Sequence, residues 1–373
     1  MKWLFWLSFA VLAYTFAGYI AWLWLRSLLH SRPVARAAIV PTVSVVMVVR
    51  NEEDLLEHKL RNLLDLDYPA EQLQLIVVSD GSTDGTEAIL REHAKDPRVH
   101  ALLNALPKGK ASGLNDAMEW AQGEIIVFTD ARQRIERSAL RMLVENFADP
   151  AVGCASGELM LGDPPNGEVV KGTGLYWRIE KRIRELESGS GSVVGATGAL
   201  YAVRRELVPT LPPGSILDDV YIPMHVVRTG ARAVFDGRAR AWDVPDLGAQ
   251  REFRRKVRTL SGNYQLLQIA PWLLGGSNPV RFEFISHKLL RLLAPFALAA
   301  ALVSAAFIAA PFYHVALALQ IIFYGLGFLG MLPGKKGPFT RLADAAYTFV
   351  MLNAAAVMAF GNFVTGRKEL WIR

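Results

Sequence analysis

Long apolar runs lie at the two ends of the chain, and short apolar and polar stretches alternate between them. The first run, residues 3–25, is close to the ~20 residues that cross a bilayer as a helix. A secretory signal peptide is the alternative, but this run is long for one and no A-x-A cleavage site follows it. Basic and histidine side chains follow instead: Arg26, His30, Arg32 and Arg36. We therefore expect residues 1–36 to form a transmembrane helix with a basic flank.

The C-terminal third repeats this apolar pattern. Residues 292–310 and 312–332 contain no Asp, Glu, Lys or Arg. One helix over both would be on the order of 60 Å long, twice the hydrocarbon thickness, so we expect a break at Pro311. A last apolar segment covers residues 342–364. We expect residues 289–373 to be a C-terminal transmembrane region.

Basic residues near the spans predict how the chain is oriented, because loops rich in Lys and Arg stay in the cytoplasm. The basic flank at residues 26–36 places the central region in the cytoplasm and the N-terminus outside. A basic loop before the last span agrees with this orientation: Lys335, Lys336 and Arg341. Four spans would place the tail outside, although it is basic as well: Arg367, Lys368 and Arg373.

A shorter stretch, residues 271–288, mixes large apolar side chains with Arg281 and Lys288. Such a composition suits a helix that lies flat in the membrane interface. A plain linker helix is an equal alternative.

The central region, residues 41–270, has the pattern of a soluble α/β domain. Its β-branched runs are too short for a membrane and fit buried strands: Val43–Val49, residues 73–79 and residues 124–129. Helical stretches separate or follow them, at residues 52–65, from Thr83 or Asp84 towards Lys95, and at residues 111–121. Alternating strands and helices predict a parallel sheet with helices on both faces.

Composition narrows the class of protein. The 373 residues are 52% hydrophobic and 20% charged, which excludes a disordered or fibrous chain. The single cysteine, Cys154, excludes a disulfide framework and a zinc site with several thiolates. The net charge of +6 suits anionic lipid head groups or phosphate ligands.

Polar side chains follow each of the three predicted strands. They are Asn51 and Glu52, then Asp80, then Asp130 and Arg132. In parallel α/β sheets ligands bind outside the carboxyl ends of the strands, so we expect these side chains to share one rim. Each aspartate alone also fits an ordinary turn or helix cap.

Carboxylates gathered at one rim need a counter-charge. A divalent cation is one candidate, and oxygen-only ligation favours Mg²⁺ or Mn²⁺ over zinc. Lys108, Lys110 and Arg132 are the cationic alternatives. A nucleoside diphosphate suits such a rim, because carboxylates accept hydrogen bonds from base and ribose while cations bind phosphate.

Two further groups of charged residues occur later in the chain. Asp218 and Asp219 precede a helical stretch, where they would serve as helix caps or, alternatively, as a general base for a hydroxyl nucleophile. Five positive charges fall within eight residues: Arg251, Arg254, Arg255, Lys256 and Arg258. This cluster suits anionic lipid or a leaving pyrophosphate. Nucleic acid is disfavoured, because few aromatic residues are interleaved and the segment adjoins the membrane.

Taken together, the motifs resemble the membrane-bound glycosyltransferases of family 2, which have the GT-A fold. In order along the chain they are VVRNEE, VVSDGSTDGT, GKASGLNDAM, VFTDARQ, ILDDV and RKVRT. The resemblance covers residues 43–265, and the flanking spans match the architecture of the family.

The resemblance implies a role for each motif residue. Asp80 would contact the base, Asn51, Glu52 and Lys110 would line the nucleotide pocket, and Asp130 would sit at the ribose and the metal. Asp219 would be the catalytic base, with Asp218 beside it. Residues 193–205 would shape the donor-sugar and acceptor pocket. Arg255 and Arg258 would hold the diphosphate.

The chain departs from the family pattern at two positions. Arg132 replaces the second Asp of the DxD motif, so we expect Arg132 to substitute partly for the charge of the metal, or another residue to complete the site. Thr259 replaces the Trp of the QxxRW motif. In processive synthases that Trp stacks on the growing sugar, so its loss disfavours a chain-extruding polymerase.

The resemblance predicts an inverting glycosyltransferase of the bacterial inner membrane, with the catalytic domain in the cytoplasm. It would transfer a sugar from a UDP-linked donor to a lipid or glycan acceptor during cell-envelope polysaccharide synthesis, next to membrane lipid and without nucleic acid. A processive β-glycan synthase is the alternative enzyme. A membrane scaffold with an inactive nucleotide-binding domain is disfavoured by the intact set of Asp80, Asp130 and Asp219. The sequence sets no oligomeric state.

Overall fold

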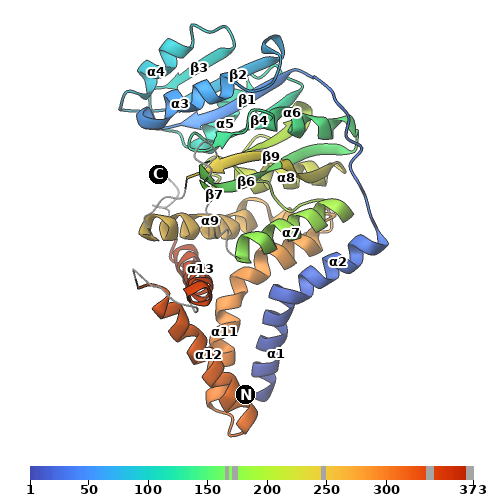
Figure 1. Ribbon diagram of the computed structural model, residues 1–373, viewed down its shortest axis with the longest axis vertical. Coiled ribbons are helices and arrows are strands. Elements are labelled where there is room, and N and C mark those ends of the chain that lie inside the picture. Colours follow the sequence, from blue (N-terminus) through green and yellow to red (C-terminus); the bar gives the residue numbers. More distant parts are fainter. Residues whose placement is uncertain (164–167, 170–174, 245–248, 333–339, 367–373) are drawn as a thin grey trace.

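A computed structural model describes residues 1–163, 168–169, 175–244, 249–332 and 340–366. A domain built on a β-sheet, which we call the sheet domain, lies at one end of the molecule (Figure 1). Long apolar helices lie at the other end, and α2, α7 and α9 run between the two parts. The catalytic residues predicted from the sequence therefore fall in a domain that stands on a layer of helices.

The described strands form one nine-stranded sheet with the order β3-β2-β1-β4-β8-β6-β9-β5, and β7 pairs with β6. From β3 to β4 neighbouring strands are parallel, whereas β8 is antiparallel to both β4 and β6, and β6 is parallel to β9. The strands are β1 Val43–Val49, β2 Leu73–Asp80, β3 Val99–Asn104, β4 Ile125–Phe128, β5 Arg134–Ile135, β6 Val152–Asp163, β7 Glu168–Val169, β8 Tyr201–Arg204 and β9 Arg232–Asp243.

Helices cover both faces of the sheet, because alternate strand residues are buried on opposite sides. Leu56, Leu60 and Leu63 of α3 pack on one face, and Leu114 and Ala117 of α5 pack on the other. The helices of this domain are α3 Glu53–Leu64, α4 Thr86–His93, α5 Lys110–Met118, α6 Ala139–Val144, α7 Leu175–Ser190, α8 Asp218–Arg228 and α9 Ala249–Ile269.

The predicted α/β sheet is confirmed in its parallel half. β1 has the expected bounds, β2 is one residue longer, and β4 lies within residues 124–129. The sequence did not predict β3 or the mixed half formed by β5 to β9. The sheet is therefore mixed rather than wholly parallel, and this second half supplies several residues of the site.

Among the described residues, four helical segments are long and apolar enough to cross a membrane, one near the N-terminus and three near the C-terminus. The first comprises α1 Lys2–Ala13, a π-helical turn at Tyr14–Gly18 and α2 Tyr19–Leu29, and the chain bends between α1 and α2 (Figure 1). The others are Arg281–Ala306, α12 Pro311–Leu329 and Leu342–Val364 within α13 Thr340–Val364. The predicted break at Pro311 is where α12 begins.

The stretch expected to lie flat in the interface, residues 271–288, is divided between two elements. A 3-10 helix covers Pro271–Leu274, and a helical segment then begins at Arg281. That segment comprises α10 Arg281–Phe284, a π-helical turn at Ile285–Leu289 and α11 Leu290–Ala306. The expected boundary between the interfacial stretch and the C-terminal transmembrane region, at residues 288 and 289, therefore falls inside a helix.

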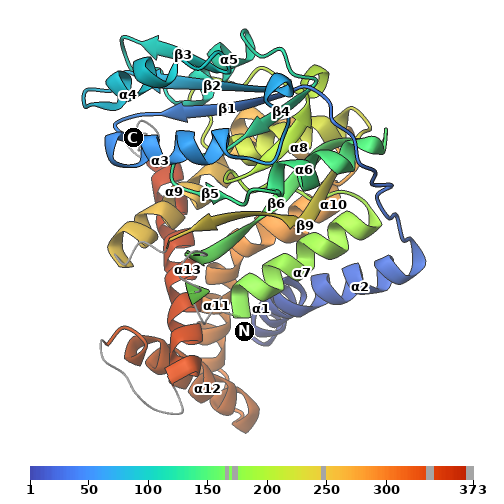
Figure 2. The ribbon, with the colours of Figure 1, turned by 45° about the horizontal axis from the view of Figure 1, so that its top comes forward.

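A buried polar network joins the sheet domain to the apolar helices. His287 lies between Glu187 (Nδ1 to Oε1, 2.8 Å) and Glu180 (Nε2 to Oε1, 3.1 Å), both on α7. Tyr19 of α2 donates to Glu187 Oε1 at 2.7 Å, and Arg291 of α11 donates to Glu180 Oε2 at 2.7 Å. Figures 1 and 2 show α2 beside α7, as these bonds require. Because these buried polar groups bond to one another, the network fixes α2 and α11 relative to α7.

The end of α13 lies against α9. The rings of Tyr264 and Phe363 stack with centroids 5.2 Å apart, and Phe360 also contacts Tyr264. The last turn of α13 thus packs on a helix of the sheet domain. The basic loop residues Lys335 and Lys336, and the tail residues Arg367, Lys368 and Arg373, lie outside the described part of the chain, so their predicted sides stay predictions.

Candidate active site

The predicted rim exists at the carboxyl ends of three adjacent strands. Asn51 and Glu52 follow β1, Asp80 ends β2, and Asp130 follows β4. Because β1 lies between β2 and β4 in the sheet, these residues emerge along one edge.

Asn51 has an unusual backbone that shapes this edge. Its φ is +55°, in the left-handed region that only glycine adopts freely, and no other described non-glycine residue has a positive φ. Its side-chain Oδ1 accepts a hydrogen bond from Thr83 N at 2.8 Å. Glu52 follows as the N-cap of α3 and is half-buried; burial and Asp84 raise its pKa, while Arg132 opposes the shift. The turn after β1 is thereby joined to the turn after β2.

Asp80 holds a loop in place. Its buried carboxylate accepts hydrogen bonds from the backbone N–H of Lys108 (2.6 Å) and of Gly109 (2.9 Å). Gly109 has a φ of +88° and precedes the first residue of α5, Lys110. Asp80 therefore fixes the point from which Lys110 extends, and its predicted contact with the base stays a prediction.

Lys110 lies between two of the predicted carboxylates. Its Nζ is 2.9 Å from Asp130 Oδ1 and 3.1 Å from Asp218 Oδ1. Coulombic attraction to Asp130 and Asp218 raises the pKa of Lys110 although burial opposes it, so the ammonium is charged. We call Asp130, Asp218, Asp219 and Lys110 the acidic cluster.

Asp218 and Asp219 are not helix caps. The N-cap of α8 is Leu217, without a side-chain cap, and the two aspartates occupy the first turn. Asp218 is buried and accepts a hydrogen bond from Tyr201 Oη at 3.2 Å on Oδ2. Asp219 Oδ2 accepts from the backbone N–H of Gly198 at 3.2 Å. Their carboxylates thus point at the predicted site and not at the backbone of their own helix.

Asp219 has the electrostatics of a general base. Burial and the neighbouring Asp218 raise its pKa to about 6, against the lowering effects of Lys110 and Lys288. A carboxylate with a pKa nearer neutrality accepts a proton more readily than an ordinary one.

Asp130 and Asp219 border one small space beside Gly198. A Cβ added to Gly198 would lie 3.4 Å from Asp130 Oδ2 and 3.5 Å from Asp219 Oδ2. The side chain of Asp130 is 42% exposed, so a ligand can reach its carboxylate. Residues 193–205, which the resemblance assigned to the sugar and acceptor pocket, supply this glycine.

Arg132 is bound by a carboxylate outside the acidic cluster, and its predicted role in place of the metal's charge stays a prediction. It forms an ion pair with Asp243, the last residue of β9. Arg255 of α9 approaches the same Asp243 Oδ2 at 3.6 Å. We call Arg132 and Arg255, gathered on Asp243, the arginine pair. The two predicted phosphate-binding arginines therefore meet, through a carboxylate that the sequence analysis missed.

The other basic residues of α9 are spread around the helix. Arg254 and Arg258 are exposed, and Lys256 contacts Glu252 at 3.5 Å. Arg258 forms no ion pair within the described residues. Its predicted contact with the diphosphate stays a prediction.

Lys59 is a further residue that sequence reasoning missed. Its buried ammonium, on α3, donates to Thr129 Oγ1 at 2.9 Å and to the carbonyl oxygen of Gln133 at 2.6 Å. Burial lowers the pKa of Lys59 to about 7, against the attraction of Asp130. Lys59 thereby holds both ends of the loop that carries Asp130 and Arg132. A lysine within a leucine-rich helix was the one signal in the sequence.

The acidic cluster offers little to a divalent cation on its own. In the described part of the chain no group of three His, Cys, Asp or Glu side chains could hold a metal. Asp130 Oδ1 forms an ion pair with Lys110, and Asp130 Oδ2 lies beside Gly198. The residues present therefore fit a cation that a bound diphosphate also ligates, with Asp130 as the protein ligand.

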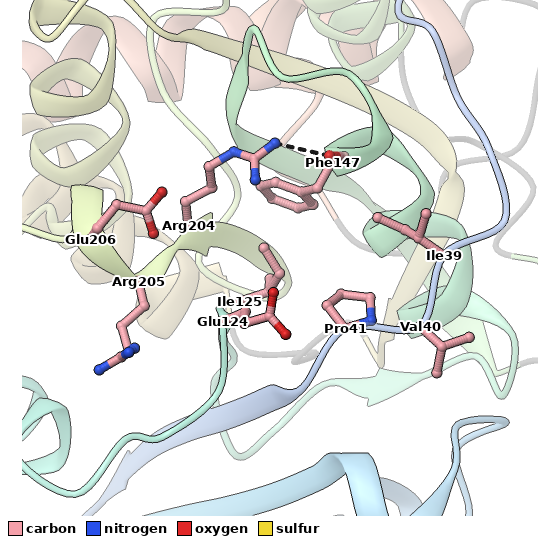
Figure 3. A pocket seen from close by; sticks show the side chains of 9 residues that line it. All are labelled: Ile39, Val40, Pro41, Glu124, Ile125, Phe147, Arg204, Arg205 and Glu206. Carbon is pink, nitrogen blue, oxygen red and sulfur yellow. Dashed lines mark hydrogen bonds between the residues drawn. The ribbon is translucent and has the colours of Figure 1, made fainter.

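A cavity of about 470 Å³ lies at the opposite edge of the sheet. It is bordered by residues that precede β1 and β4 and by residues that follow β8, among them Pro41, Glu124 and Arg205 (Figure 3). Arg204 is occupied there, since its guanidinium donates to the carbonyl oxygens of Phe147 and Val152. None of the predicted site residues borders this cavity.

Relatives of known class match this chain. Residues 44–211 match the family described as Glycosyl transferase family 2. A beta-monoglucosyldiacylglycerol synthase of Nostoc sp. (strain PCC 7120) is 27% identical over 169 residues, which are 44% of this chain and 36% of that protein. A poly-beta-1,6-N-acetyl-D-glucosamine synthase of Staphylococcus aureus (strain MSSA476) is 23% identical over 251 residues, 65% of this chain and 60% of that protein. The chain spans less than two thirds of the length of these curated relatives.

One solved structure matches almost the whole chain. The mannosyltransferase PcManGT from Pyrobaculum calidifontis, in complex with GDP-Man and Mn²⁺, is 25% identical with a TM-score of 0.75. The match covers 98% of this chain and 99% of that one, apolar helices included. The predicted GT-A fold is thereby confirmed. Residues 44–211 of this chain therefore form a domain of the kind described as Glycosyl transferase family 2, within a fold similar to that of PcManGT.

Proposed function

We propose that the chain is an inverting glycosyltransferase that transfers a sugar from a nucleoside diphosphate donor to a hydroxyl acceptor at a membrane surface. One observation carries the proposal most directly. Lys110 joins Asp130 and Asp218, and the carboxylates of Asp130 and Asp219 both lie beside Gly198. Residues from four distant parts of the sequence thus build one site.

In this mechanism Asp219 removes the proton from the acceptor hydroxyl as its oxygen attacks the anomeric carbon. The bond from that carbon to the diphosphate oxygen breaks, and the sugar is transferred with inversion. Lys110 holds the carboxylates of Asp130 and Asp218 in place. Negative charge that develops on the departing diphosphate is stabilised by Arg132 and Arg255, with Arg258 one helical turn along from Arg255.

A divalent cation, held by the diphosphate and Asp130, would add positive charge at the leaving group. PcManGT holds Mn²⁺ together with its donor, which supports this assignment. The engaged Asp130 Oδ1 and the position of Arg132 predict that Mn²⁺ binds measurably only when nucleotide is present.

The donor and acceptor classes follow from the relatives. The motif resemblance favours a UDP-linked sugar, while PcManGT binds GDP-Man, so both bases belong in the test. The curated relatives include a glucosyldiacylglycerol synthase and a polysaccharide synthase, which supports a lipid or glycan acceptor.

We place residues 41–270 in the cytoplasm as the catalytic domain, between membrane regions at 1–36 and 289–373, with 271–288 leading into the membrane. The basic flank after the first span supports this orientation. The contact of α13 with α9 supports the C-terminal end of α13 on the same side as the catalytic domain. This argues against the outside tail that four spans require, because the three C-terminal segments would then cross the membrane an even number of times.

A processive β-glycan synthase is the second candidate, because poly-N-acetylglucosamine synthases are among the relatives. Thr259, in place of the stacking Trp, favours single transfer instead.

The test is a screen of the purified full chain in detergent against UDP- and GDP-sugars, with and without Mn²⁺. Released nucleoside diphosphate and product length are the readouts. We expect one donor to be consumed and one sugar to be added to a membrane acceptor. Long polymer would favour the second candidate, and consumption of no donor would contradict the proposal.

A further inference from the structure

We infer that Asp243 is a positioning residue that sets Arg132 and Arg255 to bind the diphosphate of the donor. The inference rests on the proposed function, since it concerns how the same site recognises its nucleotide. It adds a residue that none of the family motifs contains.

Asp243 is rigidly placed. It ends β9, pairs with Leu161 of β6 in the sheet, and is 1% exposed. Burial raises its pKa, and Arg132 is the strongest opposing influence. A carboxylate on a sheet strand moves little, so groups bound to it share a fixed reference point.

Both guanidinium groups lie between this carboxylate and solvent. The side chains of Arg132 and Arg255 are 34% and 43% exposed, whereas that of Asp243 is 2% exposed. A guanidinium has five N–H donors, so one edge can bind Asp243 while other donors face a ligand. Arg255 also donates to Glu252 at 2.6 Å, which leaves Arg132 the less encumbered of the two.

The two oxygens of the Asp243 carboxylate differ in their hydrogen-bond partners. Oδ2 accepts from Arg132, lies 3.4 Å from Gln133 Nε2 and lies 3.6 Å from Arg255 Nη1. Oδ1 is buried and accepts no hydrogen bond from any described residue. A buried unpaired oxygen is destabilising, and 3.6 Å is too long for a good hydrogen bond.

The unpaired Oδ1 suggests how the arginine pair rearranges when a diphosphate binds. Two guanidinium groups repel each other, and Asp243 supplies the one negative charge that lies between them, because Glu252 pairs with Arg255 alone. A diphosphate on the solvent side adds negative charge that both arginines can share, so Arg255 can close onto Oδ1 while Arg132 keeps Oδ2. Each carboxylate oxygen then has one arginine, and both arginines face the two phosphates.

The same strand offers a matched control. Asp236 of β9 is also 2% exposed and also lies between two arginines, Arg238 at 2.8 Å and Arg36 at 3.3 Å. None of the predicted site residues contacts it. Asp236→Asn removes a similar buried charge without touching the arginine pair.

The experiment compares UDP with UMP, or GDP with GMP if guanine is preferred, by calorimetry on the full chain in detergent. The nucleotides in each pair differ by one phosphate, so their affinity ratio isolates recognition of that phosphate. We expect Asp243→Asn to weaken diphosphate binding about tenfold and monophosphate binding by less than about twofold. Asp236→Asn should leave the ratio unchanged.

A second set of variants separates positioning from folding. Arg132→Gln and Arg255→Gln should each lower the ratio, and Asp243→Asn added to the double variant should lower it no further. This set still decides the question if Asp243→Asn alone does not fold, because a ratio that neither arginine variant changes would overturn the inference.

Three results with Asp243→Asn would also overturn the inference: equal weakening of both nucleotides, stronger diphosphate binding, or a change in the ratio no larger than that of Asp236→Asn. Wild-type protein that binds no nucleotide is a distinct outcome, which would contradict the proposed function and this inference with it.

Discussion

The acidic cluster and the arginine pair have opposite ratios of cationic to acidic side chains at one site. In the acidic cluster one ammonium, Lys110, contacts two carboxylates and a third lies close by. In the arginine pair one carboxylate, Asp243, is approached by two guanidinium groups. In the first centre carboxylates outnumber the ammonium, whereas in the second two guanidinium groups share one carboxylate and Glu252 pairs with Arg255 alone.

This difference matches the two ends of a glycosyl transfer. Burial and the neighbouring Asp218 raise the pKa of Asp219, as a base for the acceptor requires. Two guanidinium groups with exposed donors suit a leaving diphosphate. Each centre therefore fits the partner that the proposed reaction would bring to it.

Substituting the base should have the largest effect on the acidic cluster. Asp219→Asn removes the proton acceptor and keeps the shape, so we expect transfer to fall by about a thousandfold. Nucleotide binding should stay within about twofold, because the arginine pair is untouched. Initial rates and calorimetry measure the two effects, and near-normal turnover would exclude Asp219 as the base.

Removing the shared ammonium comes next. Lys110→Met leaves three carboxylates without their cation, so we expect transfer to fall by about a hundredfold. The loss of positive charge should also move the acid limb of the pH–rate profile upward, because Lys110 lowers the pKa of Asp219. A profile that keeps its wild-type position would show that Lys110 does not act on the base.

Adding a methyl group at Gly198 should have a smaller effect. Gly198→Ala places a methyl group at ordinary contact distance from both Asp130 and Asp219, so the fold should tolerate it. We expect about tenfold slower transfer, because the methyl group takes space that the reactants need. Gly189→Ala on α7, where an added Cβ has no neighbour within 4 Å, is the control and should leave the rate unchanged.

The smallest effect is the pH dependence of the wild type. Asp219 must be deprotonated to act, and its pKa is raised to about 6. Activity should therefore be full above that pH, fall to about half near pH 6, and be lost as the pH falls further. An acid limb near pH 4, the range of an ordinary carboxylate, would contradict the electrostatic account of the acidic cluster.

The sequence predicted strands with a continuous apolar run and missed strands in which charged residues interrupt the pattern. β1 is VSVVMVV, a continuous β-branched run buried on both faces, and its bounds were predicted. β9 is RAVFDGRARAWD, in which charges and a glycine interrupt the apolar pattern, and it was missed. Arg238 and Arg240 are tolerated there because they pair with acidic neighbours, Glu145 and Asp236 for one and Glu158 for the other. Such pairing is tertiary, so no local period shows it.

The site was predicted where function is local and missed where it depends on distant partners. Asp130, Asp218 and Asp219 stand at strand or helix ends, where position alone suggests a role. Asp243 gains its role from Arg132, which lies 111 residues away in the sequence. The ion pair of Arg132 with Asp243 was missed for the same reason, since the partner of Arg132 could not be read from the motif.

The most direct test of the account is a structure of the full chain with a bound nucleoside diphosphate sugar. We predict the diphosphate on Arg132 and Arg255, with the anomeric carbon facing Asp219 across the space beside Gly198. Density for the nucleotide elsewhere, for example in the cavity beside Pro41 and Glu124 at the opposite edge of the sheet, would contradict it.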